Sequence, residues 1–524
     1  MNSSTGTRKR ASTPKYVSPN QLTLCGFETP FEQKLNKENR WVKMSHLIPW
    51  DKIVVGYDSQ FKSLEGRPPI SGRIVIGAVI IRQLLNLTDE ETINQIQENM
   101  FMQYFLGYSS FTNEAPFSSS LFVEIRVRLS LEVVNGINDV IIATSFEKPQ
   151  PLVVESKNAP SDIATNKDNF PSEDVSTTSD SDSIAEGGVK EAVPIEKNQG
   201  KLLMDATVAP QNITYSTDLK LLNSAREKSE ELIDKLYRKE LHGDEKVRTY
   251  RENARKDFLN SARKKTKGSK EIYRANGSQL RYLKRNLSHI TFLLKAYLEK
   301  GIRIGLKQRD MDYLHVLELV YLQQYKMHTE RVNKIENRIV NIHQSYVRPI
   351  VRGKEGKKVE FGSKIQASLV NGFVYLDKLS WDNFNEGTCL LLSVELYKKR
   401  FGFYPAEVLA DQIYCTQENR RALKARNIKL MAKPLGRPSK QALDNHVRPG
   451  ERNPIEGKFG QGKVKYGLAN ICTKLKATSE SCIASIMLVL NLVNLTRLNL
   501  VCLYQGYCRI SRCHFGILFL GLSC

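Results

Sequence analysis

The sequence has no uninterrupted apolar run of about 18 residues, which is the length that a membrane-spanning helix needs. Its most apolar stretch, IASIMLVLNLVNL at 483–495, is shorter and predicts a buried helix. The first twenty residues are polar and basic and have no apolar centre, which does not fit a signal peptide. We therefore expect a cytoplasmic protein that does not depend on a membrane.

The nine cysteines lack the paired spacing of structural zinc sites, in which two to four residues separate the members of a pair. Four of them crowd the C-terminus beside His514, with five, four and ten residues between them: Cys502, Cys508, Cys513 and Cys524. This tail differs in character from the rest of the chain. An altered or frame-shifted C-terminus explains it at least as well as a metal site does, and both interpretations stay open.

Acidic residues are too few to balance the basic ones. The 524 residues include 78 Lys and Arg against 56 Asp and Glu, a formal net charge of +22. A surplus of this size suggests a polyanionic partner, with nucleic acid first and an anionic membrane second. A basic surface without a special partner is the alternative. The length allows two or three domains.

The chain divides by composition into five segments. Residues 1–30 form a basic tail that we expect to be disordered, and for 31–150 we expect an all-helical N-terminal domain that binds DNA. Within that domain, Thr88 and Glu91 predict a capping box that opens a second helix after a tight turn. The helix pair fits a DNA-binding helix-turn-helix and an ordinary corner of a helical bundle equally well.

Residues 151–198 are acidic and Ser-rich and predict a linker, since they have too little apolar surface to fold. Residues 199–495 read as an α/β domain, in which Asn371-Gly372 predicts a β-hairpin. A basic helical insertion is expected after its first strand or two, at about 217–345. Between Lys246 and Arg285 there are fourteen Lys or Arg and three acids, which indicates either a DNA-binding surface or a solvated helix. Residues 496–524 are the atypical tail.

Three carboxylates are candidates for chemistry. Asp205 and Asp411 each follow the apolar start of a strand, LLMD and VLAD, and Glu456 stands alone in the basic stretch RNPIEGKFGQGKVKYGL. Three acids brought together repel one another unless divalent cations neutralise them, and Mg²⁺ prefers oxygen ligands. The sequence therefore predicts a magnesium site at Asp205, Asp411 and Glu456.

The stretch around Glu456 can be tested as one face of a helix. At 100° per residue, Arg452, Glu456, Lys463 and Tyr466 fall within about 80° of one another. Such a face offers a metal-binding acid flanked by two cations and a ring that hold DNA. Four glycines disfavour a helix here, unless a DNA backbone must approach closely.

The same stretch also matches most of a phosphate-binding P-loop, since it reads G-x-x-x-x-G-K from 457 to 463. Val464 stands where such a loop needs Ser or Thr, and no strand is expected before residue 457. We reject the P-loop on these grounds.

Together these segments resemble the DDE-type transposases of bacterial insertion sequences that have a helical N-terminal domain of the InsH type. The resemblance spans about residues 30–495. It depends on NLTDEETINQIQENMFMQYFLGY and PFSSSLFVEIRVRL in the N-terminal part, and on LLMDATVAPQNITYSTDLKLLNSAR, EVLADQIYCTQENRRAL and the stretch around Glu456 in the remainder. Arg452, Glu456 and Lys463 match the family signature of Arg, three residues, Glu, six residues, Lys. Where the family often has Tyr before this Arg, the sequence has Pro449.

The resemblance implies an RNase H-like catalytic domain in which Asp205, Asp411 and Glu456 are catalytic and bind two Mg²⁺ ions, with Mn²⁺ as a substitute. One metal would activate water and the other would stabilise the leaving 3′-oxygen, and in strand transfer the freed 3′-hydroxyl would replace water. Contacts to DNA are expected from the neighbouring side chains Arg452, Lys458, Lys463, Lys465 and Tyr466.

The expected partner is double-stranded DNA, as element ends and as target, bound by a homodimer or higher assembly at the nucleoid. The expected function is cleavage and strand transfer at the terminal inverted repeats of the element. A catalytically inactive, transposase-derived DNA-binding protein is the alternative, because a fold does not guarantee an activity.

Overall fold

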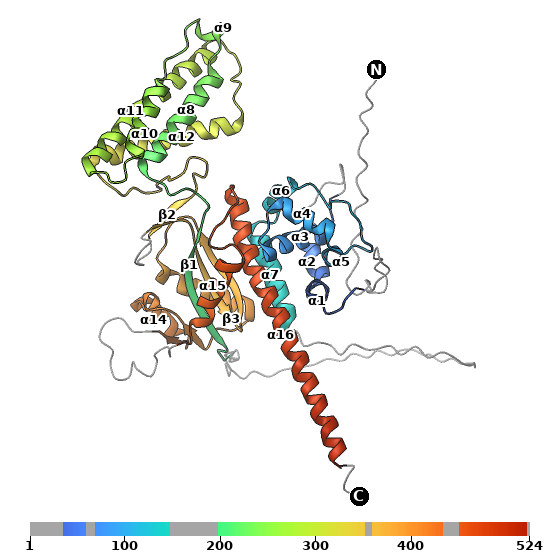
Figure 1. Ribbon diagram of the computed structural model, residues 1–524. Coiled ribbons are helices and arrows are strands. Elements are labelled where there is room, and N and C mark those ends of the chain that lie inside the picture. Colours follow the sequence, from blue (N-terminus) through green and yellow to red (C-terminus); the bar gives the residue numbers. More distant parts are fainter. Residues whose placement is uncertain (1–34, 59–68, 147–196, 352–358, 433–449, 521–524) are drawn as a thin grey trace, which may run out of the picture.

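The computed structural model describes residues 35–58, 69–146, 197–351, 359–432 and 450–520 (Figure 1). In the last of these ranges, side chains are described only as far as residue 498. The expected basic tail, nearly all of the acidic linker, Pro449 and the C-terminal cysteine side chains lie outside the described residues. The predictions made for them stay predictions.

The segment before the linker is helical, as predicted. Its helices are α1 (Arg40–Leu47), α2 (Trp50–Asp58), α3 (Gly72–Leu85), α4 (Asp89–Glu98), α5 (Met100–Leu106), α6 (Leu121–Arg128) and α7 (Leu131–Phe146). The predicted capping box is present at the start of α4, where the Thr88 side chain accepts from the Glu91 N–H and the Glu91 carboxylate accepts from the Thr88 N–H. The sequence therefore sets this helix start locally.

The pair α3 and α4 is better explained as a bundle corner than as a DNA-reading motif. Asn86 ends α3 in the left-handed conformation, with φ of 52°, and α4 begins three residues later. The helix α4, with the sequence DEETINQIQE, has four acids and no base. Because these acids would repel DNA phosphates, α4 is poorly suited to enter a groove.

A six-stranded mixed sheet forms the centre of the second part of the chain. Its strands are β1 (Lys201–Pro210), β2 (Arg348–Val351), β3 (Val359–Val370), β4 (Phe373–Ser380), β5 (Glu407–Leu409) and β6 (Lys429–Met431). Their order is β2-β3-β1-β5-β6, and β4 also pairs with β3. β1 is antiparallel to β3 and parallel to β5, which is in turn parallel to β6. The predicted α/β character is confirmed.

The hairpin predicted at Asn371-Gly372 joins β3 to β4. The two residues have φ values of 50° and 84°, and Val370 pairs with Phe373 across the turn. Asn and Gly adopt this left-handed backbone at little cost, which is why the dipeptide identifies the turn in the sequence.

Between β1 and β2 the chain forms α8 (Asp218–Leu236), α9 (Lys239–His242), α10 (Arg251–Ala262), α11 (Ser269–Glu299) and α12 (Gln308–Glu330). These helices form a bundle beside the sheet (Figure 1), and the core of the bundle is separate from the main core. The helical pattern expected to about residue 345 ends earlier than predicted. Arg331 takes the left-handed conformation and stops α12, and Ile339 and Ile342 then pack into the bundle core from a segment without regular structure.

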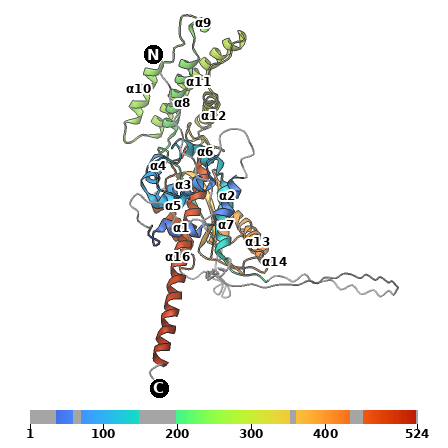
Figure 2. The same ribbon diagram turned by 90° about the vertical axis from the view of Figure 1, so that its right-hand side faces the viewer.

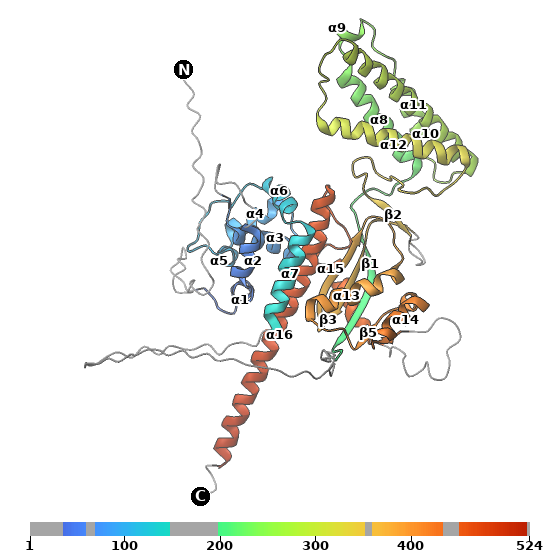
Figure 3. The ribbon, with the colours of Figure 1, turned by 180° about the vertical axis from the view of Figure 1, so that it is seen from behind.

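The remaining elements surround the sheet: η2 (Glu386–Cys389), α13 (Leu390–Phe401), η3 (Gln412–Tyr414), α14 (Gln417–Ala425), α15 (Asn453–Lys465) and α16 (Lys476–Leu520), of which η2 and η3 are 3₁₀ helices. Helix α16 runs between the N-terminal helices and the sheet, as Figure 3 shows, and contacts α7, α3 and β4. Figure 2 shows the same helix extending past these elements toward the C-terminus. One continuous hydrophobic core joins the N-terminal helices, α16 and the sheet.

Polar contacts reinforce this junction. The side chain of Asn491 on α16 donates to Asn138 on α7 at 2.9 Å and to the Val374 carbonyl on β4 at 2.7 Å, and it accepts from the Val374 N–H at 2.7 Å. Because all these groups are buried, each needs the partner that the junction supplies.

Within the described part of the chain, one helical stretch, Lys476–Leu498, is long and apolar enough to cross a membrane by length and composition alone. It contains the run for which the sequence predicts a buried helix. Of the most apolar 18-residue window in this stretch, 72% is buried inside the protein. The packing of α16 between helices and sheet accounts for this apolar composition.

Candidate active site

The register of two parallel strands brings Asp205 and Asp411 to the same region. Leu203 on β1 pairs with Leu409 on β5, and each aspartate follows its leucine by two residues. Parallel strands place their carboxyl ends at the same edge, so short segments far apart in the sequence become neighbours. The two predicted catalytic acids therefore lie close together, Asp205 within β1 and Asp411 just after β5.

The two aspartates differ in their local setting. Asp411 lies two residues after the end of β5 and caps η3, where its Oδ1 accepts from the Gln412 N–H at 2.8 Å. Asp205 lies within its strand, because β3 continues to pair with β1 as far as Pro210. The Asp411 side chain is 58% exposed, and that of Asp205 is 18% exposed.

Arg452 lies between these two carboxylates. Its Nη2 is 3.4 Å from Asp205 Oδ2, and its Nη1 is 3.2 Å from Asp411 Oδ1. Arg452 is the residue immediately before α15 and is itself mostly buried. One guanidinium thus compensates two acids that would otherwise repel each other.

Burial raises the pKa of Asp205 to about 6. The Ala206 N–H and the charge of Arg452 lower this pKa, and the negative charges of Glu386 and Asp411 raise it. The net rise means that the cationic and hydrogen-bonding partners present here compensate the buried charge only in part.

Glu386 is a neighbouring acid that the sequence analysis did not identify. It begins η2 and forms an ion pair with Lys364 on β3 at 2.8 Å. η2 packs tightly on η3, since a Cβ at Gly387 would lie 2.7 Å from the Ile413 carbonyl oxygen. A single acid in a loop has no distinguishing sequence pattern, so only the packing of η2 on η3 reveals it.

A buried hydrogen bond holds η3, and with it Asp411, against the centre of the sheet. The Tyr414 hydroxyl donates to Gln366 Oε1 on β3 at 2.8 Å, and both residues are fully buried. Burial raises the pKa of Tyr414, which keeps the hydroxyl protonated as a donor. Tyr414 thus positions the turn that begins with Asp411.

Helix α15 forms as predicted, despite its glycines. Ile455 and Phe459 bury its inner face against the sheet and α16, and Gly462 allows close approach to α16, since a Cβ there would lie 3.3 Å from Leu468 and 3.5 Å from Leu490. Gly457 and Gly460 have open space where a Cβ would be. Burial of the apolar face therefore offsets the poor helix propensity of glycine.

Glu456 is exposed in the first turn of α15, one turn after Arg452. Among the residues that the structure describes, no three His, Cys, Asp or Glu side chains are grouped closely enough to hold a metal ion. The structure thus brings Asp205 and Asp411 together through Arg452 and does not group Glu456 with them.

The other predicted DNA contacts are distributed unevenly. Lys465 is exposed, Lys463 is partly exposed, and Lys458 is partly buried with a pKa lowered by burial and by the charge of Arg497. Tyr466 is only 6% exposed, and its carbonyl accepts from the Gln83 side chain at 2.6 Å. The prediction that the Tyr466 ring holds DNA does not fit this structure, because the ring is packed in the main core.

Two family models match the chain. The model described as a transposase DDE domain matches residues 408–493, and the one described as a transposase domain (DUF772) matches residues 29–128. The chain belongs to the DDE-type insertion-sequence transposases. The DDE match includes Asp411, Arg452, Glu456 and Lys463 of this transposase, and Asp205 joins them through the pairing of β1 with β5.

Among curated proteins, the transposase is similar to an uncharacterized protein, ORF8 in the nfe locus of Rhizobium meliloti. The two are 24% identical over 130 residues, which is 24% of this chain and 62% of that protein. The chain thus spans less than two thirds of the length of this relative. No solved structure matches the transposase.

Transposases of this type generally use a divalent metal, and the donor set found here fits such an ion. Asp205 and Asp411 supply carboxylate oxygens, which are the ligands that Mg²⁺ prefers. The position between them already holds the positive charge of Arg452. Because burial still raises the pKa of Asp205, additional positive charge at this position would stabilise the ionised carboxylate.

Proposed function

We propose that this transposase binds the terminal inverted repeats of its element and catalyses metal-dependent DNA cleavage and strand transfer. The observation that carries the proposal is the placement of Asp205 on β1 and of Asp411 just after the neighbouring parallel strand β5, with one cation between them. We assign this sheet to an RNase H-like catalytic domain with α8–α12 as a helical insertion, and we place the protein at the nucleoid in the cytoplasm.

Asp205, Asp411 and Glu456 would hold Mg²⁺, two ions per site, with Mn²⁺ as a substitute. When bound, the metal supplies Lewis-acid stabilisation of the charge that develops on the scissile phosphodiester. Glu456 follows Arg452 by four residues and so shares its helix face. A shift of the Arg452 side chain away from the aspartates would therefore open the space between them toward Glu456.

DNA would be held by the cations of α15 and of the bundle. Arg452, released from the two aspartates, would contact a phosphate, and Lys463 and Lys465 would extend this contact along the strand. Gly457 and Gly460 have open space in place of a side chain on α15, which lets a DNA backbone approach closely at these two positions. Assembly as a homodimer or a higher oligomer on DNA, with element ends and target as substrates, completes the proposal.

The decisive experiment compares Asp205→Asn and Asp411→Asn with the wild type in cleavage of DNA that contains an element end. Both variants should lose cleavage in Mg²⁺ and Mn²⁺ and keep DNA binding in a mobility-shift assay. Asp312→Asn, an exposed acid on α12, is the matched control and should cleave normally. Unchanged cleavage by either active-site variant would overturn the metal assignment.

A DNA-binding protein without catalytic activity is the second candidate. The observation that favours it is that Glu456 is not grouped with the two aspartates in this structure. Intact inverted repeats and short target duplications around the gene, together with cleavage by the wild type, would exclude it. Binding without cleavage at any divalent metal concentration would establish it.

A further inference from the structure

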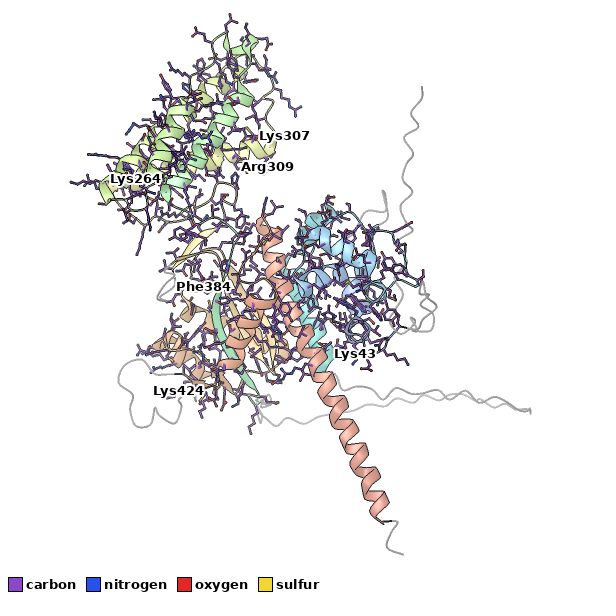
Figure 4. The ribbon with its side chains drawn as sticks, viewed as in Figure 1. Lys43, Lys264, Lys307, Arg309, Phe384 and Lys424 are labelled. Atoms are coloured by element: carbon purple, nitrogen blue, oxygen red, sulfur yellow. The ribbon has the colours of Figure 1, made fainter. Side chains whose placement is uncertain are left out.

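A cavity of about 700 Å³ lies in the helical bundle, away from the aspartates. Its wall comes from the first two turns of α11, the end of α12 and the segment that follows α12. The side chains that matter for its chemistry are Lys270, Tyr273, Arg274, Asn276, His328 and Arg331. Figure 4 locates this end of the bundle by Lys264, whose ion-pair partner Glu271 is in the first turn of α11.

Two planar rings are stacked at the cavity. The rings of Tyr273 and His328 are 3.9 Å apart at their centres and inclined by 16°. Gly277 makes room for this stack, because a Cβ there would lie 3.0 Å from His328 Nε2. Tyr273 remains 40% exposed, and the Arg331 guanidinium lies 5.4 Å from the centre of its ring, so a planar group that reaches this ring pair lies beside a cation.

The cavity is also cationic. Lys270, Arg274 and Arg331 line it, and none of them has an acidic partner among the described side chains. The one acid in the lining, Asp218, is already engaged by Arg338 at 2.6 Å and by Gln324 at 2.9 Å. Lys270 and Arg274 also lie in the first turns of a helix whose N-terminus has no side-chain cap. These features favour an anion.

A third feature is a buried acceptor without a donor. Asn276 Oδ1 is shielded from solvent and has no hydrogen-bond partner in the described structure. A buried polar atom of this kind is usually satisfied by a ligand or a water. An amide beside stacked rings can accept from the polar edge of a nucleobase.

We infer that this cavity binds a nucleotide, with the base against the Tyr273–His328 stack and the phosphate at Lys270, Arg274 and Arg331. A bare anion would use the cations and leave the rings and Asn276 without a role, whereas a nucleotide uses all three features. The nucleotide has two possible sources, an unpaired residue of DNA or a free nucleotide. The first of these rests on the proposed DNA binding, and the second does not.

The test uses the full chain and three probes: dAMP, a duplex with one unpaired 2-aminopurine, and the fully paired duplex of the same sequence. Tyr273→Ala and Arg274→Ala should each weaken binding of the nucleotide-bearing probe about tenfold, as is typical for loss of base stacking or a phosphate contact. Tyr273→Phe keeps the ring and should bind as the wild type does. Phe292→Ala is the matched control, since Phe292 is a 57% exposed aromatic on the same helix outside the cavity.

Preference for the unpaired duplex that Tyr273→Ala abolishes would support DNA as the source, and Tyr273-dependent binding of dAMP alone would support a free nucleotide. Competition by inorganic phosphate with no effect of Tyr273→Ala would overturn the inference in favour of a simple anion site. Equal binding of all probes by the wild type and Tyr273→Ala would also overturn it. If neither duplex binds, the proposed DNA binding fails, and the dAMP arm still decides the cavity.

Discussion

The guanidinium of Arg452 lies 3.4 Å from the carboxylate of Asp205, a residue almost 250 positions earlier in the chain, and it also reaches Asp411. The contact places one cation between the two acids of the candidate active site. It also joins the start of α15 to the central strand β1. A divalent cation that binds the two aspartates must therefore compete with Arg452 for their charge.

Removal of Arg452 should strengthen metal binding and should lower the free energy of unfolding of the metal-free protein. Arg452→Ala leaves two neighbouring acids uncompensated, which should cost about 1–3 kcal/mol in the free energy of unfolding without metal. Added Mn²⁺ should then raise the melting temperature more in this variant than in the wild type. Arg255→Ala, an exposed arginine on α10, is the control. Equal metal-induced shifts in all three proteins would contradict competition between Arg452 and the metal.

The stability of the metal-free protein should depend on pH through Asp205. The pKa of about 6 in the folded protein exceeds the ordinary value of 3.8, so the folded state binds the proton more tightly. The protonated Asp205 carboxyl therefore stabilises the folded state fully below about pH 4, and this stabilisation is lost as the pH rises through 6. The free energy of unfolding falls by about 3 kcal/mol at most through this loss. The Asp205→Asn variant has no charge at this position and should be more stable than the wild type at pH 7.5. The gain in stability is smaller by the amount that the ion pair of Asp205 with Arg452 contributes in the wild type.

This difference should vanish near pH 4, where the wild-type carboxyl is protonated. Denaturant unfolding in EDTA at the two pH values measures it. A difference of the same size at both values would show that the effect of Asp205→Asn does not arise from ionisation.

The junction between the N-terminal helices and the sheet should depend on Asn491. Asn491→Ala leaves the buried Val374 N–H without its acceptor and the buried Asn138 Oδ1 without its donor, so we expect a loss of about 2–4 kcal/mol in the free energy of unfolding. Chemical unfolding followed by circular dichroism measures the loss. Asn94→Ala on the exposed face of α4 should change the stability by less than about 0.5 kcal/mol. A loss below about 1 kcal/mol for Asn491→Ala would show that the buried contacts are not needed.

The salt dependence of DNA binding should report on the basic stretch Lys246–Arg285. Replacement of Lys264, Lys265 and Lys267 by Gln should reduce the slope of log affinity against log salt by about 2–3, at roughly 0.9 per phosphate contact. The control variant replaces Lys300, Lys307 and Lys326, which are exposed on the same bundle outside the stretch. An unchanged slope for the first variant would assign the stretch to a solvated surface.

Much of the local structure follows from the sequence itself. The capping box at Thr88 and the hairpin at Asn371-Gly372 depend on neighbouring residues, so their patterns can be recognised in the sequence without knowledge of the fold. Helix α15 is different, because it forms despite its glycines through burial of Ile455 and Phe459. The helical pattern failed at Arg331 because apolar spacing continues there while the chain leaves the helix to pack Ile339 and Ile342 from an irregular segment. Apolar periodicity indicates which residues are buried. It does not indicate whether a helix or an irregular segment places them in the core.

The sequence alone determined which acids follow short apolar strand segments and which cations surround Glu456. Only the tertiary structure decided that Arg452 contacts Asp205 and Asp411, that Tyr466 is packed in the core, and that Glu386 lies close enough to affect the pKa of Asp205. The physical reason is that strand pairing and helix packing bring together segments as far apart as Gln83 and Tyr466, which are separated by 383 positions, and the charge and burial of each side chain depend on such distant neighbours.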